Sequence, residues 1–363
     1  MKLLRLLLVP FALACVGLMR LAWPRLKVRI GDICSPRIGH MLGNMECYLC
    51  EREAGMHGGA IDLWYHRKPI SNRFAAKLLE RALLVDLTGF VPLVDTCNRL
   101  FRGWEKHVCA PAQCDRDIYN LMEKQKPHLR FKPRELRKGA ALRRKLGIPD
   151  GAEWVCLIIR DAAYLPGLAY HRHRDTEADD YIPAAVKLVE RGYYVLRMGA
   201  KVAQPFKVKH SKIIDYATSG QRSDFMDLYL GAHCAFCLST CTGFDTIPMV
   251  FRRPILYVNH VPLEYLMTFV PGSLAIWKHH MKDGKRMKPA EIFSANVGQF
   301  MRAEEYEAAG VKLEDNSPQE IVDAAMEMAE RVERKLSGSM SIDQAGLVRH
   351  LDFWRAFPRT ISP

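Results

Sequence analysis

The sequence predicts an α/β protein with two doubly wound, Rossmann-like domains that face each other across a crevice. From residue 150 onward, continuous apolar runs alternate with amphipathic segments at the spacing of parallel strands and crossover helices. Residues 25–130 repeat this alternation less regularly. A chain of 363 residues, 49% hydrophobic and 9% aromatic, is also long enough for two ordinary cores. We divide it into 1–24, 25–130, 131–149, 150–336 and 337–363.

Residues 1–24 are predicted to be a membrane-associating segment. Residues 6–19 carry no charge and lie between Arg5 and Arg20. This run is shorter than the roughly 20 apolar residues that a spanning helix needs, so a membrane-dipping or marginally anchoring segment is expected. A signal peptide is the alternative, because residues 12–15 resemble a lipoprotein cleavage site. Cations on both sides of the run and eleven scattered cysteines favour the anchor and a reducing compartment.

The positive charge is concentrated in the first part of the chain. Residues 1–150 hold 27 Lys+Arg against 14 Asp+Glu, which equals the whole net charge of +13. This surplus, including the basic run 130–145, predicts an anionic partner: a membrane surface, a phosphorylated ligand or nucleic acid. The basic run lacks interleaved aromatics, which disfavours nucleic acid. A solvated basic helix is the plain alternative for this run.

The first domain, 25–130, is expected to be the smaller one. Its predicted elements are a strand at 26–32, a loop at 35–44 that leads into a helix, a strand at 60–66 and a helix at 71–84. Residues 131–149 are predicted to be a basic linker to the second domain.

The second domain, 150–336, shows the clearer alternation. The predicted strands are 154–161, 193–199, 212–217, 234–240 and 254–259. The predicted helices are 179–192, 223–232 with Ser223 as N-cap, 242–251, and 316–336 with Ser317 as N-cap. Residues 341–354 are expected to form a closing helix.

The turn that follows strand 234–240 is the main candidate for donor binding. In two facing α/β domains a ligand lies beyond the carboxyl ends of the strands. Thr240 or Thr242 can cap the next helix, Gly243 lets the backbone approach closely, and the helix start favours a phosphate. Asp245 is positioned to hydrogen-bond a ribose hydroxyl. An ordinary capped turn is the alternative.

Two further strand ends carry arginine. Arg160 and Asp161 close the first strand of the second domain, and Arg197 with Gly199 closes the next. Guanidinium suits bidentate contact with phosphate, so these residues are assigned to the donor site. Salt bridges between the domains are the alternative explanation.

Polar loops supply the remaining ligand candidates in the second domain. The loop 170–181 contains His171, Arg172 and Arg174 between acidic residues, but it lacks the spacing of a closed metal site. Ser223 and Asp224 begin the helix that follows the third strand. We assign all five residues to ligand-contacting loops.

The segment 35–44 of the first domain supplies the candidate base. It offers Arg37, His40 and Asn44 at the start of a helix, on the acceptor side of the predicted crevice. Because imidazole titrates near neutrality, His40 is the natural general base for an acceptor hydroxyl. A phosphate ligand or a helix cap is an equal alternative for His40. Should His40 fail, Glu46, Asp161 or His171 would be the next candidates.

The sequence does not favour a Cys₄ metal site, and it contains none of the common nucleotide-binding or hydrolase motifs. Two C-x-x-C pairs, Cys47/Cys50 and Cys234/Cys237, suggest a Cys₄ zinc site. However, side chains three apart on a strand point to opposite faces, which argues against one. The sequence contains no P-loop, G-x-G-x-x-G, H-E-x-x-H or G-x-S-x-G motif.

Several blocks resemble a bacterial family of glycosyltransferases linked to surface-polysaccharide synthesis. They are RIGHMLGN, CLIIRDAAYL, YHRHRD, GYYVLRMG, the long block from IDYATSGQRSDFMDLYL to RRPILYVN, and EDNSPQEIVDAAMEM. The likeness covers most of residues 30–335, and the Cys-Thr-Gly-Phe-Asp block is its most specific part. The resemblance implies a GT-B architecture in which the C-terminal domain holds a nucleotide-sugar donor.

The expected function is transfer of a sugar from a nucleotide-sugar to a glycan or lipid-linked acceptor. No metal or other cofactor is expected, because Arg160, Arg197 and the helix start would stabilise the leaving diphosphate. The expected partners are the donor, the acceptor and an anionic membrane surface but not nucleic acid, at the cytoplasmic face of the bacterial inner membrane. A nucleotide-sugar epimerase and a non-catalytic basic membrane- or nucleic-acid-binding protein are the alternatives.

Overall fold

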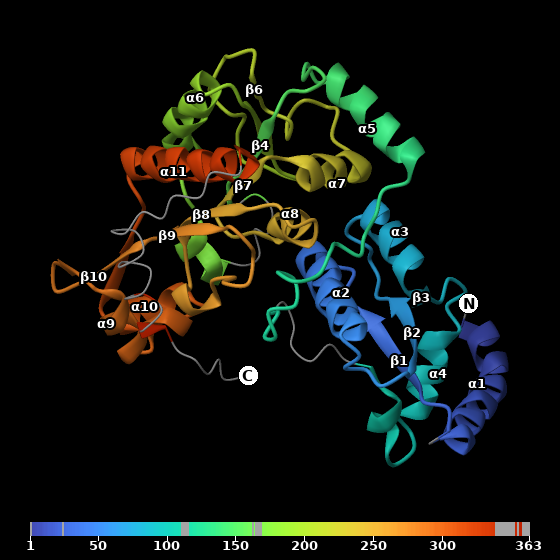
Figure 1. The fold of residues 1–363 in the computed structure, drawn as a ribbon. Helices are drawn as coiled ribbons and strands as arrows, with labels where there is room; N and C mark the ends of the chain where they lie inside the picture. The colour runs from blue at the N-terminus through green and yellow to red at the C-terminus, as the bar shows by residue number, and fades with distance from the viewer. Residues whose placement is uncertain are drawn as a thin grey trace. The chain divides into compact units, whose positions relative to one another are not determined.

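The computed structural model describes residues 2–23, 25–109, 116–161, 163, 169–337, 353 and 356–357. The chain divides into two compact units, Met1–Lys132 and Pro133–Pro363 (Figure 1). The basic segment after residue 132 folds with the second unit as helix α5 (Pro133–Lys145). Arg143 of this helix is buried, pairs with Asp150 and lies 5.6 Å from the ring of Trp154.

Unit 1 contains a parallel sheet of strand order β1-β2-β3. Its elements after α1 are β1 (Val28–Ile33), α2 (Ile38–Glu53), β2 (Ile61–His66), α3 (Arg73–Ala82), β3 (Leu84–Val85), α4 (Val91–Asn98) and η1 (Trp104–His107). The register pairs Ile33 with His66, so both β1 and β2 end at the same edge. Gly31 is required in β1, because a Cβ there would lie 2.4 Å from the ring of Trp64.

Helix α1 (Lys2–Ala22) packs on one side of unit 1, beside α4 (Figure 1). Ala12 and Val16 are buried against Ile30, Val94 and Cys97. The predicted membrane-associating segment is therefore a helix with one face in the core of unit 1. Among the described residues, no helix has the length and apolar character needed to span a bilayer.

Unit 2 contains a parallel sheet of order β6-β5-β4-β7-β8-β9. The chain runs outward from β4 to β6, returns to β7 beside β4, and continues outward to β9. The strands are β4 (Trp154–Ile158), β5 (Tyr194–Met198), β6 (Ile213–Ile214), β7 (Phe236–Ser239), β8 (Ile255–His260) and β9 (Leu274–Trp277). This is a doubly wound sheet whose topological switch point lies between β4 and β7.

Helices cover both faces of this sheet. Helices α6 (Ile182–Glu190) and α11 (Pro318–Ser337) lie side by side and share one core with Val155 and Leu157 (Figure 1). On the other face, the Trp154 indole donates to the carbonyl O of Leu230 in α7 (Asp224–His233) at 3.0 Å. Because Trp154 alternates with Val155 along β4, the strand is buried on both sides, as its continuous apolar sequence predicted.

The predicted helix at 242–251 is found as η4 (Gly243–Asp245) followed by α8 (Thr246–Val250), and η3 (Ala178–Tyr181) overlaps the start of the predicted helix at 179–192. The elements of unit 2 that were not anticipated from the sequence include η2 (Ala169–Arg174), η5 (Leu263–Tyr265), β10 (His279–Lys282), β11 (Lys285–Arg286), α9 (Pro289–Ser294), η6 (Val297–Gln299), α10 (Ala303–Ala308) and β12 (Val311–Glu314). Strands β11-β10-β12 form a small antiparallel sheet, and Phe293, Tyr306 and Phe357 belong to the core beside it.

Most predicted elements are found within a few residues of their expected positions. The strand at 212–217 is reduced to Ile213–Ile214, and the helix of the 35–44 segment already begins at Ile38. Both predicted caps are confirmed: the hydroxyl of Ser223 accepts from Met226 N at 3.2 Å, and that of Ser317 from Glu320 N at 3.3 Å. The predicted closing helix at 341–354 lies outside the described residues, apart from residue 353.

Candidate functional site

The switch point of the unit 2 sheet brings together the ends of β4 and β7. Arg160 N donates to Thr240 Oγ1 at 2.7 Å, and Thr240 N donates to Ile158 O at 3.2 Å. These bonds continue the pairing of β4 with β7 beyond the strands themselves. Two of the predicted donor-site residues, Arg160 and Thr240, are therefore adjacent at the position where doubly wound sheets bind ligands.

The turn after β7 is held by Asp245. Its carboxylate accepts hydrogen bonds from the Ser239 hydroxyl and from Thr242 N, the latter at 2.7 Å. Thr242 in turn caps η4 by accepting from Phe244 N at 3.2 Å. Asp245 is fully buried, and this burial raises the pKa of its carboxyl group to about 6, while the Ser239 hydrogen bond acts in the opposite direction. Asp245 thus shapes the turn and offers no exposed carboxylate to a ribose.

Strained backbone marks two adjacent strand ends. Cys241, directly after β7, has φ of 59°, and Asn259, near the end of β8, has φ of 53°. Residues other than glycine adopt this left-handed region rarely, and such conformations concentrate at functional sites. Asn259 is held there by its side-chain amide, which donates to the Tyr181 hydroxyl at 3.0 Å. The predicted Gly243 follows at the exposed start of η4 and does not itself carry a positive φ.

Two guanidinium groups lie beside this turn. Arg174 donates to the carbonyl O of Cys241 at 2.7 Å, a neutral partner, and Arg160 lies 3.3 Å from Asp175. The pKa of Arg160 is lowered, first by burial and then by the like charge of Arg174. Asp175 pairs with Arg160, and the buried Asp245 is an acidic group that interacts with Arg174. The two half-buried guanidinium groups also repel each other, so an added anion would stabilise both.

A buried lysine completes the polar cluster at this edge. Lys278, at the end of β9, donates to the carbonyl O of Asp175 at 2.8 Å and pairs with Asp315 at 2.7 Å. These bonds link Asp175, the partner of Arg160 at the switch point, to the end of β9, which pairs with β8. Sequence reasoning missed Lys278, because its run AIWKHH does not have the apolar pattern of a strand end.

Arg197 is placed differently from Arg160. It lies within β5, is almost completely buried, and faces Asp215 at 3.5 Å and Asp161 at 3.8 Å. Asp161 also accepts from Ala203 N at 2.8 Å, so it fixes the loop after β5. Gly199 lies in that loop, where a Cβ would be 2.6 Å from Val202. Arg197 and Asp161 thus form a salt bridge with each other, as the alternative explanation expected. Both residues belong to unit 2, so the bridge does not join two domains.

The loop candidates are dispersed. Arg172 pairs with Glu307 of α10 at 2.5 Å, Ser223 serves as the cap of α7, and Asp224 begins that helix. The side chain of His171 lies outside the described part of the chain. Of this group, only Arg174 is shown next to the turn after β7.

The edge of the unit 1 sheet holds the candidate base. Arg37 precedes α2 without forming a side-chain cap, and His40 is half-buried in the first turn of that helix. Asn44 lies one turn further and is buried. The start of α2 therefore presents an imidazole and a guanidinium at the carboxyl end of β1.

A second histidine at this edge was missed by the sequence reasoning. His66 ends β2, and its Nδ1 lies 2.7 Å from the hydroxyl of Ser35, which also bonds the carbonyl O of Ile33 at 3.1 Å. Its Nε2 faces Glu80 at 3.6 Å. Burial lowers the pKa of His66, although Glu80 acts in the opposite direction, so the ring is neutral at pH 7. The available signal was a histidine directly at a predicted strand end.

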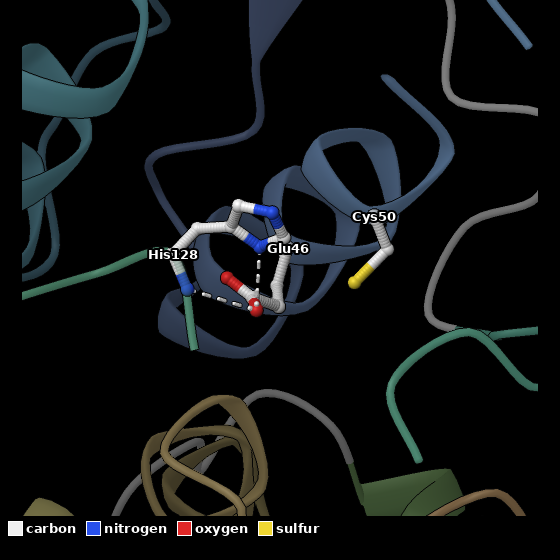
Figure 2. A group of neighbouring side chains, drawn as sticks. All are labelled: Glu46, Cys50 and His128. Carbon is white, nitrogen blue, oxygen red and sulfur yellow. Dashed lines mark hydrogen bonds and ion pairs between the residues drawn. The ribbon is translucent and has the colours of Figure 1, made fainter. Parts of the chain in front are cut away.

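Glu46, one of the alternative bases, lies in the interior of unit 1. Figure 2 shows it on α2 with Cys50 one turn away and His128 facing it. His128 Nδ1 lies 3.1 Å from Glu46 and its Nε2 lies 2.8 Å from Glu53. Hydrogen bonds to Glu46 and Glu53 raise the pKa of His128 against the effect of burial. The trio has donor types that bind divalent metals, and the bonds from His128 to Glu46 all end on one carboxylate oxygen, Oε1.

The two C-x-x-C pairs belong to different units. Cys47 and Cys50 are buried in α2 of unit 1, whereas Cys237 lies in β7 and Cys234 ends α7 of unit 2. Cys234 and Cys237 are fully buried, and burial raises the pKa of Cys237 far above its usual value. Cys234 is the C-cap of α7 and lies before β7, so Cys234 and Cys237 are not three apart on one strand as the sequence argument assumed.

Comparison with known proteins gives matches in structure only. No family model and no curated protein matches the sequence. A solved glycosyl transferase family 9 structure from Veillonella parvula DSM 2008 matches 84% of this chain and 97% of its own, with a TM-score of 0.51 and 11% identity. Escherichia coli ADP-heptose LPS heptosyltransferase II matches 84% and 100%, with a TM-score of 0.43 and 12% identity. The iron-containing glycosyltransferase TibC from enterotoxigenic E. coli H10407 matches 87% and 81%, with a TM-score of 0.43 and 12% identity.

At this identity the likeness concerns the fold. The parallel-stranded α/β architecture expected from the sequence is confirmed by the two sheets and by the similarity to the Veillonella protein. That architecture is the one used by a family 9 glycosyl transferase.

Proposed function

We propose that this protein is a metal-independent glycosyltransferase of GT-B type. It transfers a sugar from a nucleotide-sugar donor to a glycan or lipid-linked acceptor in surface-polysaccharide synthesis. The observation that carries the proposal is the pair of half-buried cations Arg160 and Arg174 at the β4–β7 switch point, beside the turn in which Cys241 has a positive φ. Sequence resemblance and the shared fold support the same reaction class.

The cationic pair suits the diphosphate of the donor. When the bond between the anomeric carbon and the phosphate oxygen breaks, the nucleoside diphosphate leaves with the bonding electrons. Guanidinium groups that are already fixed can stabilise that charge without reorganisation. Arg160 and Arg174 are fixed by bonds to Thr240 and Cys241, and Lys278 is the next cation along the edge.

The acceptor hydroxyl loses its proton to a base, for which we propose His40. Its oxygen forms the new bond to the anomeric carbon, and the proton moves to the imidazole of His40. His66 is the second candidate, because its neutral ring is oriented by Ser35 and keeps Nε2 as the proton acceptor. This assignment makes the transfer inverting, since a base of this kind serves direct displacement at the anomeric carbon.

The donor proposal is tested by thermal unfolding of the full chain with UDP, GDP, CMP, ADP and the corresponding nucleotide sugars. ADP-heptose belongs in this panel because the E. coli neighbour is named for it. At a ligand concentration 100 times the dissociation constant, the true ligand adds about 2.7 kcal/mol to the unfolding free energy. No shift with any nucleotide or nucleotide sugar at millimolar concentration would refute the proposal.

Analysis of products separates transfer from the epimerase alternative. A transferase releases the free nucleotide diphosphate in the presence of acceptor, whereas an epimerase returns an isomeric nucleotide sugar and needs no acceptor. A non-catalytic basic protein would do neither. We place the reaction at the cytoplasmic face of the bacterial inner membrane, which fits the free thiols of the ten described cysteines.

A further inference from the structure

The outward face of α1 is apolar along its described length. A surface helix normally presents polar residues on this side. Here the exposed positions between residues 6 and 21 are Leu6, Leu7, Pro10, Phe11, Leu13, Ala14, Gly17, Leu18 and Leu21. Leu7, Phe11, Leu18 and Leu21 follow one stripe at helical spacing, and between 65% and 83% of each residue is exposed.

This face is not needed for the packing of unit 1. The opposite side of the helix supplies Ala12 and Val16 to the core, in contact with residues of β1 and α4. Continuous exposed apolar surface of this kind marks an interaction site. The outward stripe is therefore a candidate contact surface for a partner that is not part of unit 1.

Cations border the carboxyl-terminal end of the stripe. Arg20 donates to the carbonyl O of Arg102 at 3.0 Å and lies 5.3 Å from the ring of Phe101, which extends the apolar surface. Arg25 and Lys27 are exposed directly after the helix, and Lys27 lies 5.9 Å from the ring of Trp23. Arginine, lysine and an aromatic ring at the end of an apolar helix are typical of a membrane interface.

The cationic border includes a shallow hollow at the end of α4. Residues 99–105 line this hollow of about 380 Å³, and Arg99, Arg102 and Trp104 are among them. Leu100, 76% exposed, lies at its rim. Arg99 pairs with Asp95 at 3.2 Å and lies 4.5 Å from the ring of Trp104, and Glu105 also lines the hollow. Arg102 is therefore the guanidinium group of this hollow that can contact a phosphate headgroup.

The positive charge of unit 1 distinguishes between the two possible partners of the stripe, a second copy of the chain and a lipid surface. Unit 1 holds 21 Lys+Arg against 12 Asp+Glu, and α1 contains no acidic residue. A second copy docked on the same face would bring two sets of Arg20, Arg25 and Lys27 together, which is unfavourable. An anionic lipid surface can bury the apolar stripe and also neutralise the positive charges of Arg20, Arg25 and Lys27.

We infer that α1 lies flat in the interface of an anionic lipid bilayer. The stripe of Leu7, Phe11, Leu18 and Leu21 enters the boundary between headgroups and acyl chains. Arg20, Arg25, Lys27 and Arg102 contact lipid phosphates from the border. The helix thus acts as an interfacial anchor and does not cross the membrane, in agreement with its packing on α4. This inference is independent of the nucleotide-sugar proposal, because no residue of unit 2 takes part.

Co-flotation of the full chain with phospholipid vesicles tests the anchor. One set of vesicles is pure phosphatidylcholine, and the other contains roughly a third phosphatidylglycerol. Binding is expected to the anionic vesicles and to weaken with salt. Leu18→Asp is expected to lower the partition coefficient about tenfold or more, since a large apolar group leaves the interface. The matched control is Leu136→Asp on α5 of unit 2, where Leu136 is 41% exposed, and it should bind as wild type.

A charge series sharpens the assignment of the lipid. Arg25→Glu and Lys27→Glu should each lower binding to anionic vesicles by about fivefold or more, and Lys285→Glu in unit 2 should not. Thermal unfolding verifies that each variant is folded. Equal binding to both vesicle types, or Leu18→Asp binding as wild type, would overturn the inference. Concentration-dependent dimerisation that Leu18→Asp abolishes, without vesicle binding, would assign the face to a second copy instead.

Discussion

The carboxyl edges of the two parallel sheets are built from different chemical groups. In unit 2 the edge gathers cations, with Arg160 and Arg174 beside the strained turn at Cys241. In unit 1 the edge gathers imidazoles, with His40 at the start of α2 and His66 at the end of β2. Fixed cations are suited to holding an anion, and imidazoles are suited to moving a proton. In the proposed transfer reaction, the first edge would hold the leaving diphosphate and the second would accept the proton of the acceptor.

A similar contrast exists within unit 2 itself. Arg160 and Arg197 both come from strand ends, but Arg197 lies between Asp161 and Asp215 and is almost completely buried. Arg160 is less buried and lies next to another cation, which lowers its pKa after the effect of burial. The acids around Arg197 assign it to the support of the fold, whereas the surroundings of Arg160 are compatible with the proposed role in binding a phosphate.

The largest expected effect concerns the imidazole edge. His40→Ala should lower turnover about 10²–10⁴-fold, the usual contribution of a general base. Nucleotide affinity should stay within twofold of wild type, because the diphosphate is bound by unit 2. Steady-state kinetics and nucleotide titration of the same preparation measure both quantities.

His66→Gln provides the comparison for His40. If His66 is the base, this variant shows the loss of turnover and His40→Ala keeps the wild-type pH profile. A loss of nucleotide affinity in His40→Ala, with residual turnover of unchanged pH profile, would instead make His40 a phosphate ligand.

The next effect separates the two strand-end arginines by stability. Arg197→Ala leaves Asp161 and Asp215 without their shared buried cation, so the unfolding free energy should fall by about 3 kcal/mol or more. Arg160→Ala removes one ion pair at 3.3 Å and relieves repulsion from Arg174, so it should change stability by less than about 1 kcal/mol. Chemical denaturation of both variants measures the difference. Equal losses of unfolding free energy would mean that Arg160 and Arg197 contribute equally to the stability of the fold.

A smaller effect comes from the buried turn at Asp245. Its carboxyl pKa is raised from 3.8 to about 6, so the folded chain holds this proton more tightly than the unfolded chain. The resulting stabilisation is complete below pH 3.8 and is lost as the pH rises toward 6, by up to about 3 kcal/mol. Asp245→Asn should remove this contribution from the pH dependence of unfolding.

Asp227→Asn serves as the control for Asp245. Burial raises the pKa of Asp227 to about 6 as well, but its partners are Arg222 and Tyr216 outside the turn. Both groups act over the same pH range, so each variant should remove only its own share of the pH dependence of the unfolding free energy. If the unfolding free energy of Asp245→Asn changes with pH between pH 4 and pH 6 as that of wild type does, the Asp245 carboxyl of the folded wild-type protein is ionised over this range.

The sequence predicted most strands of the unit 2 sheet and the polar residues at their ends. Continuous apolar runs predicted β4, β5, β7 and β8, because a strand covered on both faces needs no polar residue until it ends. The same rule placed Arg160 and Thr240 at the sheet edge. It also singled out the start of α2, where His40 lies.

The roles of individual polar residues could not be predicted in the same way. Asp245 and Arg197 were assigned to the ligand because their residue types fit one, but the assignment depends on partners from distant segments. Asp215 lies 18 residues from Arg197, and Asp161 lies 36 away. Lys278 was missed because the run before it lacks the apolar pattern of a strand, and His66 was overlooked although it ends a predicted strand.

The central claim is that Arg160 and Arg174 hold the donor diphosphate. The most direct test is the dissociation constant of the best nucleotide from the thermal screen, measured by calorimetry for wild type, Arg160→Ala, Arg174→Ala and Arg191→Ala. Arg191 is the matched control, because it pairs with Glu333 at 2.8 Å at the C-terminal end of α6 and away from the strand ends. The account predicts about 10–100-fold weaker binding for Arg160→Ala and for Arg174→Ala, the loss of one charge-assisted contact each, and no change for Arg191→Ala. Wild-type affinity in both Arg160→Ala and Arg174→Ala would contradict it.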